Sequence, residues 1–123
     1  MKSINLLELS QQLTEYWSPR IVGRVNDQFI KVAKLKGEFC WHAHELEDEM
    51  FLVLKGELTI QFEHEEIHLR EGDSFVVVRG VRHNPKCENE CLVALIEPVS
   101  TKHTGDVTTP LTKSIEQQLL KSS

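Results

Sequence analysis

Residues 37–56 read GEFCWHAHELEDEMFLVLKG, and the two histidines inside this stretch decide how the rest of the sequence is interpreted. His42 and His44 are two residues apart, so on a β-strand both imidazoles leave the same face. Glu49 opens the next apolar run and adds a carboxylate. A His-x-His pair alone is more often a pair of exposed polar positions than a metal site. Two imidazoles and one carboxylate are at most half of a metal site. A further ligand elsewhere in the sequence is needed to support this interpretation.

A second stretch supplies that ligand. Residues 72–83 read GDSFVVVRGVRH: a glycine turn, an apolar strand, another glycine turn and then the lone His83. Together the two stretches resemble the paired motifs of the cupin superfamily. The first cupin motif is G-x5-H-x-H-x3/4-E-x6-G, and the second is G-x5-P-x-G-x2-H-x3-N. The resemblance covers about Gly37 to Pro98, which is most of the chain.

Most positions of both motifs are occupied. The residues that fit are glycines and presumed ligands: His42, His44, Glu49 and Gly56 in the first motif, and Gly72, Gly80 and His83 in the second. Three positions depart from the pattern. Gly37 is one residue closer to the first histidine than expected, Val78 replaces proline and Cys87 replaces asparagine. None of these departures changes a presumed ligand.

The resemblance implies an all-β fold, the cupin jelly-roll barrel or double-stranded β-helix. It also implies that four side chains converge on one divalent metal ion inside the barrel: His42, His44, Glu49 and His83. Three imidazoles and one carboxylate suit Mn, Fe, Co, Ni, Cu or Zn, and they suit Ca or Mg poorly. Such a set leaves one or two coordination positions open for water or substrate, which is typical of a catalytic metal.

Composition argues against several other classes of function. The chain has 123 residues, a size typical of one domain. Its 14 Lys and Arg against 19 Asp and Glu give a net charge of −5, which argues against nucleic-acid or membrane-surface binding. No apolar run approaches the roughly 20 residues that span a bilayer. Residues 1–17 make a poor signal peptide, and three cysteines do not make a disulfide framework. We therefore expect a cytoplasmic protein with free thiols.

We expect a single domain over residues 1–123, with an N-terminal segment at 1–18, a barrel core at about 20–98 and a tail at 99–123. Apolar spacing predicts a helix over the first seventeen residues, with Asn5 and Glu8 imitating a capping box and Ser18-Pro19 ending it. A short C-terminal helix is expected from Leu111, with Thr109 as its cap and Pro110 at its first position.

The central part of the sequence predicts many short strands separated by turn residues, a pattern typical of a sandwich or closed barrel. The expected strands are 20–25, 29–36, 39–44, 49–54, 57–62, 65–70, 74–78, 81–86 and 91–97. Residues 50–54 and 91–96 are apolar on both faces, so each strand needs a second cover, either a packed helix or another subunit. We expect a homodimer, because two-fold dimers are the commonest closed assemblies.

The remaining histidines and cysteines receive mainly structural interpretations. His64 and His68 fall at a polar turn and on an outward strand face, so we expect them at the surface. Cys40 shares the parity of His42 and should lie inside, near the metal but not bound to it. Cys87 and Cys91 bracket an expected three-residue hairpin loop and should be free thiols.

Other charged residues flank the presumed site. Glu45, Glu47 and Asp48 are expected on a solvated rim, with Asp48 as an alternative ligand. Arg79 and Arg82 are either surface charges or a contact for an anionic substrate. His103 lies in the polar loop 100–109, which could fold over the mouth of the barrel.

Residues 41–56, with Glu97-Pro98 and Thr104-Gly105-Asp106 farther on, are similar to small cupins of the mannose-6-phosphate isomerase-like type. Fold alone does not fix function among cupins. We expect a metal-dependent enzyme of the isomerase or dioxygenase type that acts on a small oxygenated molecule such as a sugar derivative. Glu49 is the candidate catalytic residue, because it is the only ligand able to double as a base. The alternative is a non-catalytic cupin that binds or senses a small molecule.

Overall fold

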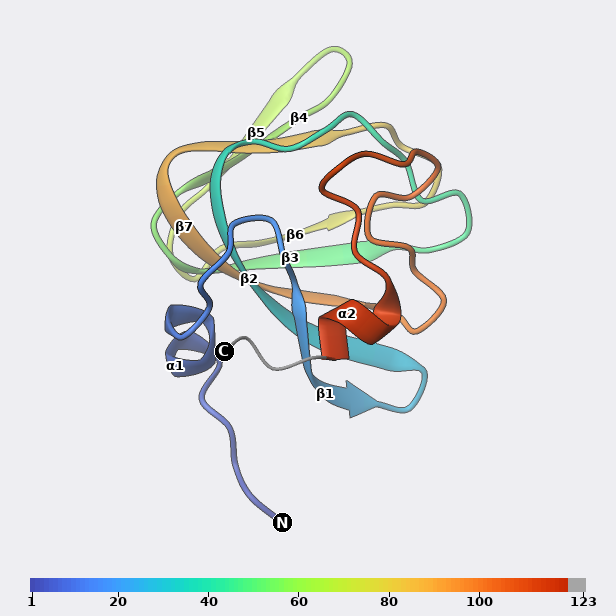
Figure 1. Cartoon of the computed structure of the whole chain (residues 1–123). Helices are drawn as coiled ribbons and strands as arrows, with labels where there is room; N and C mark the ends of the chain where they lie inside the picture. The colour runs from blue at the N-terminus through green and yellow to red at the C-terminus, as the bar shows by residue number, and fades with distance from the viewer. Residues whose placement is uncertain (120–123) are drawn as a thin grey trace.

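The fold is organised around one long strand, β7 (Asn84–Pro98), in a computed structural model that describes residues 1–119. Different parts of β7 pair with β2 (Gln28–Glu38), β3 (Glu49–Lys55) and β4 (Leu58–Gln61), and all three pairings are antiparallel. Because its first residues pair with β4 and its last with β3, β7 runs through both halves of the structure (Figure 1).

The other strands complete the sheet at its edges. β1 (Arg20–Val25) pairs with β2, and β6 (Ser74–Val77) pairs with β3, which gives the order β1-β2-β7-β3-β6. β5 (Glu66–Leu69) pairs with β4 and extends the sheet beside the first part of β7. The expected all-β jelly-roll barrel is confirmed.

The inward faces of these strands form the core by simple alternation. In β3, Phe51 and Val53 are buried, whereas Met50, Leu52 and Leu54 are half-buried on the other face. The core side chains come from nearly every strand and include Ala33, Leu35, Phe51, Val53, Leu58, Ile60, Leu69, Val77, Val93 and Leu95. The expected strands 57–62 and 65–70 also alternate, because Leu58, Ile60 and Leu69 are buried and their neighbours along each strand are more exposed.

The N-terminal helix is much shorter than the sequence predicts. α1 covers only Leu6–Gln11, and Asn5 caps it by accepting a hydrogen bond from the backbone N–H of Glu8 at 2.9 Å. The chain then turns inward at Trp17, whose φ is 56° and whose indole Nε1 donates to the carbonyl of Lys36 at 2.8 Å. Burial of this large side chain in the core ends the helix early, which local helix propensity does not reveal.

Two expectations about strands are wrong. Residues 39–44 are not a regular strand, and their one bridge joins His42 to His83. Residues 84–86 of the expected strand 81–86 and all of the expected strand 91–97 belong to one continuous strand, β7, with no hairpin between them. Leu35 pairs with Cys91 and Gly37 pairs with Cys87, so three residues of β7 oppose one residue of β2. Residues 88–90 form an exposed bulge, which absorbs extra residues without reversing the chain.

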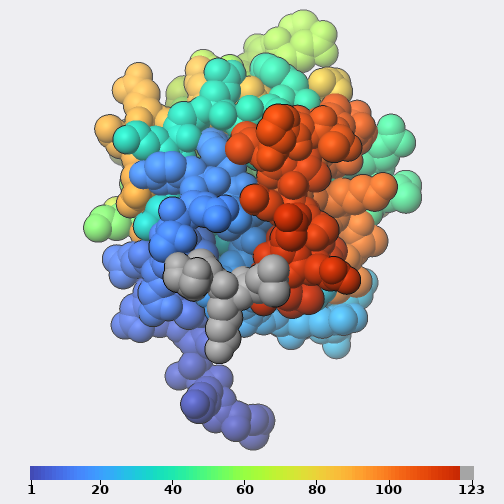
Figure 2. Space-filling view, viewed as in Figure 1, coloured from blue at the N-terminus to red at the C-terminus, as the bar shows by residue number. Residues whose placement is uncertain are grey.

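The C-terminal segment crosses the open end of the barrel and ends in α2 (Ile115–Leu119). This helix begins later than expected, because Ser114 and Gln117 exchange cap hydrogen bonds of 2.8 and 3.1 Å, while Thr109 forms a turn with Thr112. The last four residues of the expected tail lie outside the described part of the chain. Figure 2 shows the C-terminal segment beside the N-terminal one, where Lys113 pairs with Glu15 at 3.7 Å.

α1 supplies part of the second cover that the two-faced apolar strands require. It packs against β7 and β2, and Leu92 and Ala94 of β7 are buried within one chain. The outer face of β3 and β6 keeps apolar side chains at the surface, since Met50 is half-buried and its partner Val76 is 48% exposed. Within residues 1–119, no helix is long and apolar enough to cross a membrane.

We expect this outer face to pair with a second copy of the chain. Val76→Lys places a charge on the face and should convert a dimer into a monomer, whereas Val25→Lys, at the opposite edge of the sheet and 57% exposed, should not. Light scattering should give about twice 14.2 kDa for the wild type and close to 14.2 kDa for Val76→Lys. A wild-type mass of one chain at micromolar concentration would contradict the prediction.

Candidate metal centre

Four buried side chains converge inside the barrel, and their ligand atoms all lie within 4.8 Å of one another: His42, His44, Glu49 and His83. Glu49 is the first residue of β3, and His83 directly precedes β7. The two segments that carry His42 and His83 are joined by reciprocal backbone N–H···O=C hydrogen bonds of 3.0 and 2.9 Å. This bridge brings the two imidazole rings to a centroid separation of 4.4 Å.

Backbone carbonyls select the tautomer of two of these histidines. The Nδ1 atom of His42 lies 2.9 Å from the carbonyl oxygen of Cys40, and Nδ1 of His83 lies 2.9 Å from that of Val81. A carbonyl oxygen can only accept, so Nδ1 carries the proton in both rings. The lone pair is then on Nε2, which is the arrangement that orients histidine as a metal ligand.

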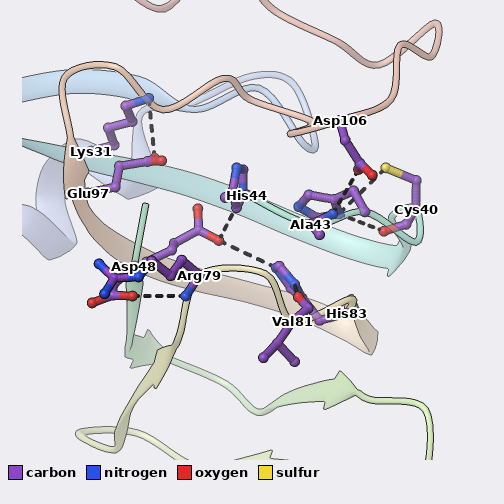
Figure 3. Close-up of polar contacts among 12 residues, drawn as sticks. Lys31, Cys40, Ala43, His44, Asp48, Arg79, Val81, His83, Glu97 and Asp106 are labelled. Atoms are coloured by element: carbon purple, nitrogen blue, oxygen red, sulfur yellow. Dashed lines mark hydrogen bonds and ion pairs between the residues drawn. The ribbon is translucent and has the colours of Figure 1, made fainter. Parts of the chain in front are cut away.

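Three candidate metal-ligand atoms, from His44, Glu49 and His83, face one another without forming hydrogen bonds. Nε2 of His44 and Nε2 of His83 each lie 3.6 Å from Oε1 of Glu49 (Figure 3). Among the described residues, none of these three buried atoms has a hydrogen-bond partner. Buried polar atoms are normally paired, so a cluster of unpaired imidazole and carboxylate donors fits a bound cation. The nitrogen and oxygen set could hold a divalent transition metal.

The pKa values describe how the cluster is charged. Burial, with a smaller contribution from the neighbouring His83, lowers the pKa of His42 to about 4, so this imidazole is neutral. Burial alone would lower the pKa of His44, but the adjacent Glu49 carboxylate outweighs burial and raises it. Burial alone would raise the pKa of Glu49, but the imidazoles of His44 and His83 outweigh burial and lower it. Without a metal ion, a proton on His44 therefore balances the ionised Glu49.

The other singled-out residues lie outside this cluster. The sulfur of Cys40 is 3.9 Å from Nδ1 of His42 and is not among the four ligand atoms. Asp48 is exposed and accepts a hydrogen bond from the backbone of Arg79 at 2.8 Å, so it is a rim residue and not an alternative ligand. Arg82 pairs with Asp106 at 3.5 Å, and neither arginine lines the cavity described below.

The expected surface histidines and free cysteines are placed as the sequence predicts. His64 and His68 are exposed. Cys87 and Cys91 are buried free thiols, and burial raises their pKa values to about 11 and about 12. Both cysteines therefore stay protonated and unreactive at neutral pH.

Sequence reasoning missed a buried ion pair beside the cluster. Nζ of Lys31 lies 3.2 Å from Oε1 of Glu97, with side chains only 1% and 3% exposed (Figure 3). Burial and the charge of Glu49 raise the pKa of Glu97 to about 7, while Lys31 opposes the shift. Strand parity could have found the pair, since Lys31 alternates in phase with the inward Ala33, and Glu97 with the inward Leu95.

A small cavity of about 40 Å³ adjoins the ligand cluster. His42 and Glu49 form part of its wall. The rest is mainly aromatic and aliphatic, with Trp17, Phe39, Phe51 and Leu95 among the lining residues, and His103 contributes a further imidazole. The candidate metal site therefore adjoins a mainly apolar cavity.

Comparison with known families agrees with the geometry. The cupin domain family matches residues 29–97, which include all four candidate ligands. The chain belongs to the cupin family. Among curated proteins, it is 35% identical over 86 residues to YdbB, an uncharacterized protein of Bacillus subtilis. The aligned region covers 69% of this chain and 76% of YdbB.

Two solved structures are similar over most of both chains. A cupin-2 domain protein from Shewanella frigidimarina is 39% identical, with a TM-score of 0.75 over 77% of this cupin and 93% of that chain. The protein NMB1881 from Neisseria meningitidis is 33% identical, with a TM-score of 0.73 over 79% of this chain and 99% of the other. These likenesses support the barrel and the family without naming a reaction.

Removing any one ligand should lower metal affinity, because only three donors remain. We expect His42→Ala, His44→Ala, Glu49→Gln and His83→Ala each to weaken binding by more than about tenfold. His64→Ala and His68→Ala serve as matched surface controls and should retain wild-type binding. The measurement is metal per subunit by elemental analysis after one shared purification and dialysis. Equal metal content in all six variants would contradict the assignment.

Metal affinity should also fall as pH decreases, because His44 becomes protonated first and His42 only at much lower pH. Because the pKa of His44 is raised above 6.5, the metal must displace a proton from it near neutral pH. Affinity should therefore begin to fall above 6.5 as pH decreases, well before His42 protonates at about 4. Competition with a chromophoric chelator from about pH 8 to about pH 5 measures this. Glu49→Gln removes the cause of the raised pKa and should move the fall to lower pH; an unchanged midpoint would refute this account.

Proposed function

We propose that this cupin is a divalent-metal enzyme that acts on a small oxygenated molecule, with a reaction of the isomerase or dioxygenase type. The observation that carries the proposal is the set of four buried ligands facing an apolar cavity of about 40 Å³. Four protein ligands leave coordination positions for a substrate oxygen. A bound metal would polarise that oxygen or, if it is iron, support chemistry with O₂.

The residues of the chain would divide the remaining tasks. Glu49 lines the cavity and is the one carboxylate among the four ligands, so it is the candidate group to accept a proton from a substrate there. The aromatic side chains of Trp17, Phe39 and Phe51 keep the chamber apolar and limit the access of water. His42 and His83 are fixed by carbonyl contacts and serve as ligands only.

The size of the cavity bears on the substrate. At roughly 10–15 Å³ for each water centre, the cavity has room for a few water molecules. This favours a compact molecule such as a short oxo acid, whereas the resemblance to mannose-6-phosphate isomerase-like cupins favours a sugar derivative. Both belong to the proposed class of small oxygenated substrates. The three cysteines are free, which supports a cytoplasmic location.

A non-catalytic binding or sensor role is the second candidate. It is favoured by the closure of the barrel mouth, where Trp17 from the N-terminal segment and His103 from the C-terminal segment both line the cavity. A ligand enclosed in this way could be held without being transformed. Turnover distinguishes the two candidates.

The test is a thermal-shift screen of sugars, sugar phosphates and oxo acids against protein loaded with Zn²⁺, Mn²⁺, Ni²⁺ or Fe²⁺. A true ligand at a hundred times its Kd should stabilise the metal-loaded protein by about 2.7 kcal/mol and the metal-free protein much less. Each hit is then followed by NMR for product and by an oxygen electrode. Oxygen consumption confined to iron would indicate a dioxygenase, and turnover with several metals would indicate an isomerase.

Glu49→Gln at saturating metal should lower kcat by at least about 100-fold, as expected for loss of a general base. His64→Ala is the surface control and should keep wild-type turnover. Metal-dependent ligand binding without product would favour the sensor role. Ligand binding that ignores the metal in every case, with no product, would overturn the metal-enzyme proposal and leave the binding role.

A further inference from the structure

His103 comes from a part of the chain that the family does not specify, yet it reaches the metal-facing cavity. The cupin family match ends at residue 97, and His103 lies six residues beyond it. The His103 ring packs against Phe39 at a centroid distance of 5.1 Å. The ring of Phe39 also contacts the ring of His42 edge-on, at a centroid distance of 5.5 Å. His103 lines the cavity together with His42 and Glu49.

The tautomer of His103 is opposite to that of His42 and His83. Its Nδ1 accepts a hydrogen bond from the backbone N–H of Lys113 at 2.9 Å, so Nδ1 has no proton. Burial, reinforced by the charge of Lys31, lowers the pKa of His103 to about 4, which keeps the ring neutral. The single ring proton is then on Nε2. Among residues 1–119, Nε2 of His103 makes no hydrogen bond to the protein and is not one of the buried unpaired atoms, so a ligand or solvent can reach it.

The segment that carries His103 is fixed to the ligand segment. Ala43, between His42 and His44, donates its N–H to Oδ1 of Asp106 at 2.9 Å and accepts the N–H of Asp106 at 3.0 Å. Gly105 approaches so closely that any Cβ at this position would collide with the carbonyl of Ala43. His103 is therefore held in place relative to the metal ligands by short backbone contacts.

Charge indicates which ligand would use this donor. Lys31 and Glu97 form an ion pair, so a divalent metal bound by three imidazoles and one carboxylate, Glu49, leaves the interior with net positive charge. A monoanion with two oxygens neutralises that charge and offers an acceptor at a fixed distance from the metal-binding atom. A compact carboxylate meets both conditions and matches the size of the cavity.

We propose that His103 is a ligand-binding residue of this site, whose Nε2–H donates a hydrogen bond to one oxygen of a small carboxylate while the other oxygen binds the metal. This inference rests on the proposed metal site and narrows its substrate class to carboxylates. It assigns specificity to the C-terminal segment, whereas the family's own residues supply the ligands.

The test uses two variants that separate the two nitrogens of the ring. In His103→Asn, the amide oxygen replaces Nδ1 as acceptor for Lys113, but the donor at the Nε2 position is lost. In His103→Gln, the amide nitrogen reaches the Nε2 position. Cobalt-loaded wild type and both variants are titrated with acetate, which has a second oxygen, and with chloride, which has none, while visible absorption of Co²⁺ is followed.

We expect His103→Asn to weaken acetate binding by about tenfold, in line with the loss of one hydrogen bond to a charged acceptor. His103→Gln should recover most of that loss. Chloride affinity and cobalt per subunit should stay at wild-type values in both variants. On the metal-free wild type, two-bond ¹H–¹⁵N NMR should show His103 with its proton on Nε2 and His42 with its proton on Nδ1.

Each alternative outcome is decisive. Unchanged acetate affinity in His103→Asn, or no acetate binding to the cobalt-loaded wild type, overturns the role of His103 while leaving the metal site intact. Equal weakening of acetate and chloride also overturns it, since the metal site itself would have changed. A proton on Nδ1 of His103 removes the donor altogether. A wild type that takes up no cobalt overturns the proposed function first, and this inference with it.

Discussion

Two reciprocal backbone hydrogen bonds between His42 and His83 are the constraint on which the rest of the structure depends. They close the barrel where the segment after β2 meets the start of β7, far apart in sequence. Each ring then donates Nδ1–H to the carbonyl two residues earlier, so the backbone path dictates the direction of Nε2. Ligand geometry is consequently set by main-chain hydrogen bonds before any ion arrives, which is the pre-organisation that a metal site requires.

Residues before and after the segment that the cupin family matches form part of the wall of the cavity. Trp17 stacks on Phe39 at 4.8 Å from the N-terminal side, and His103 packs on the same ring from the C-terminal side. Neither end falls within residues 29–97, which the cupin family matches. The family core thus supplies the ligands, whereas the ends supply the walls. This division explains why the ligands can be assigned from motifs while the substrate cannot.

The same division marks what the sequence could predict. The resemblance to the cupin motifs predicted the set of His42, His44, Glu49 and His83, which the structure brings together although residues 39–44 are not a regular strand. The predicted end of α1 and the predicted start of α2 were wrong. Trp17 turns into the core, and Ser114 and Gln117 cap α2 reciprocally, and both contacts override local helix propensity. Residues 88–90 have turn-like composition but form a bulge. The sequence cannot distinguish a bulge from a hairpin turn here, because the difference lies in how the flanking residues pair with β2. The buried ion pair of Lys31 and Glu97 was not predicted, because charged residues are rarely fully buried.

Electrostatics inside the barrel links folding to the occupancy of the site. A buried carboxylate without compensation costs several kcal/mol, and Lys31 already faces Glu97, so Glu49 depends on the proton of His44. Because the pKa of His44 is raised in the folded state, the stability from this proton is fully present below 6.5 and is lost as pH rises through the raised value. A metal ion bound by these residues would take over in that same range, where imidazole is free to bind and binding energy adds to folding. Proton and metal would then stabilise the same carboxylate in succession.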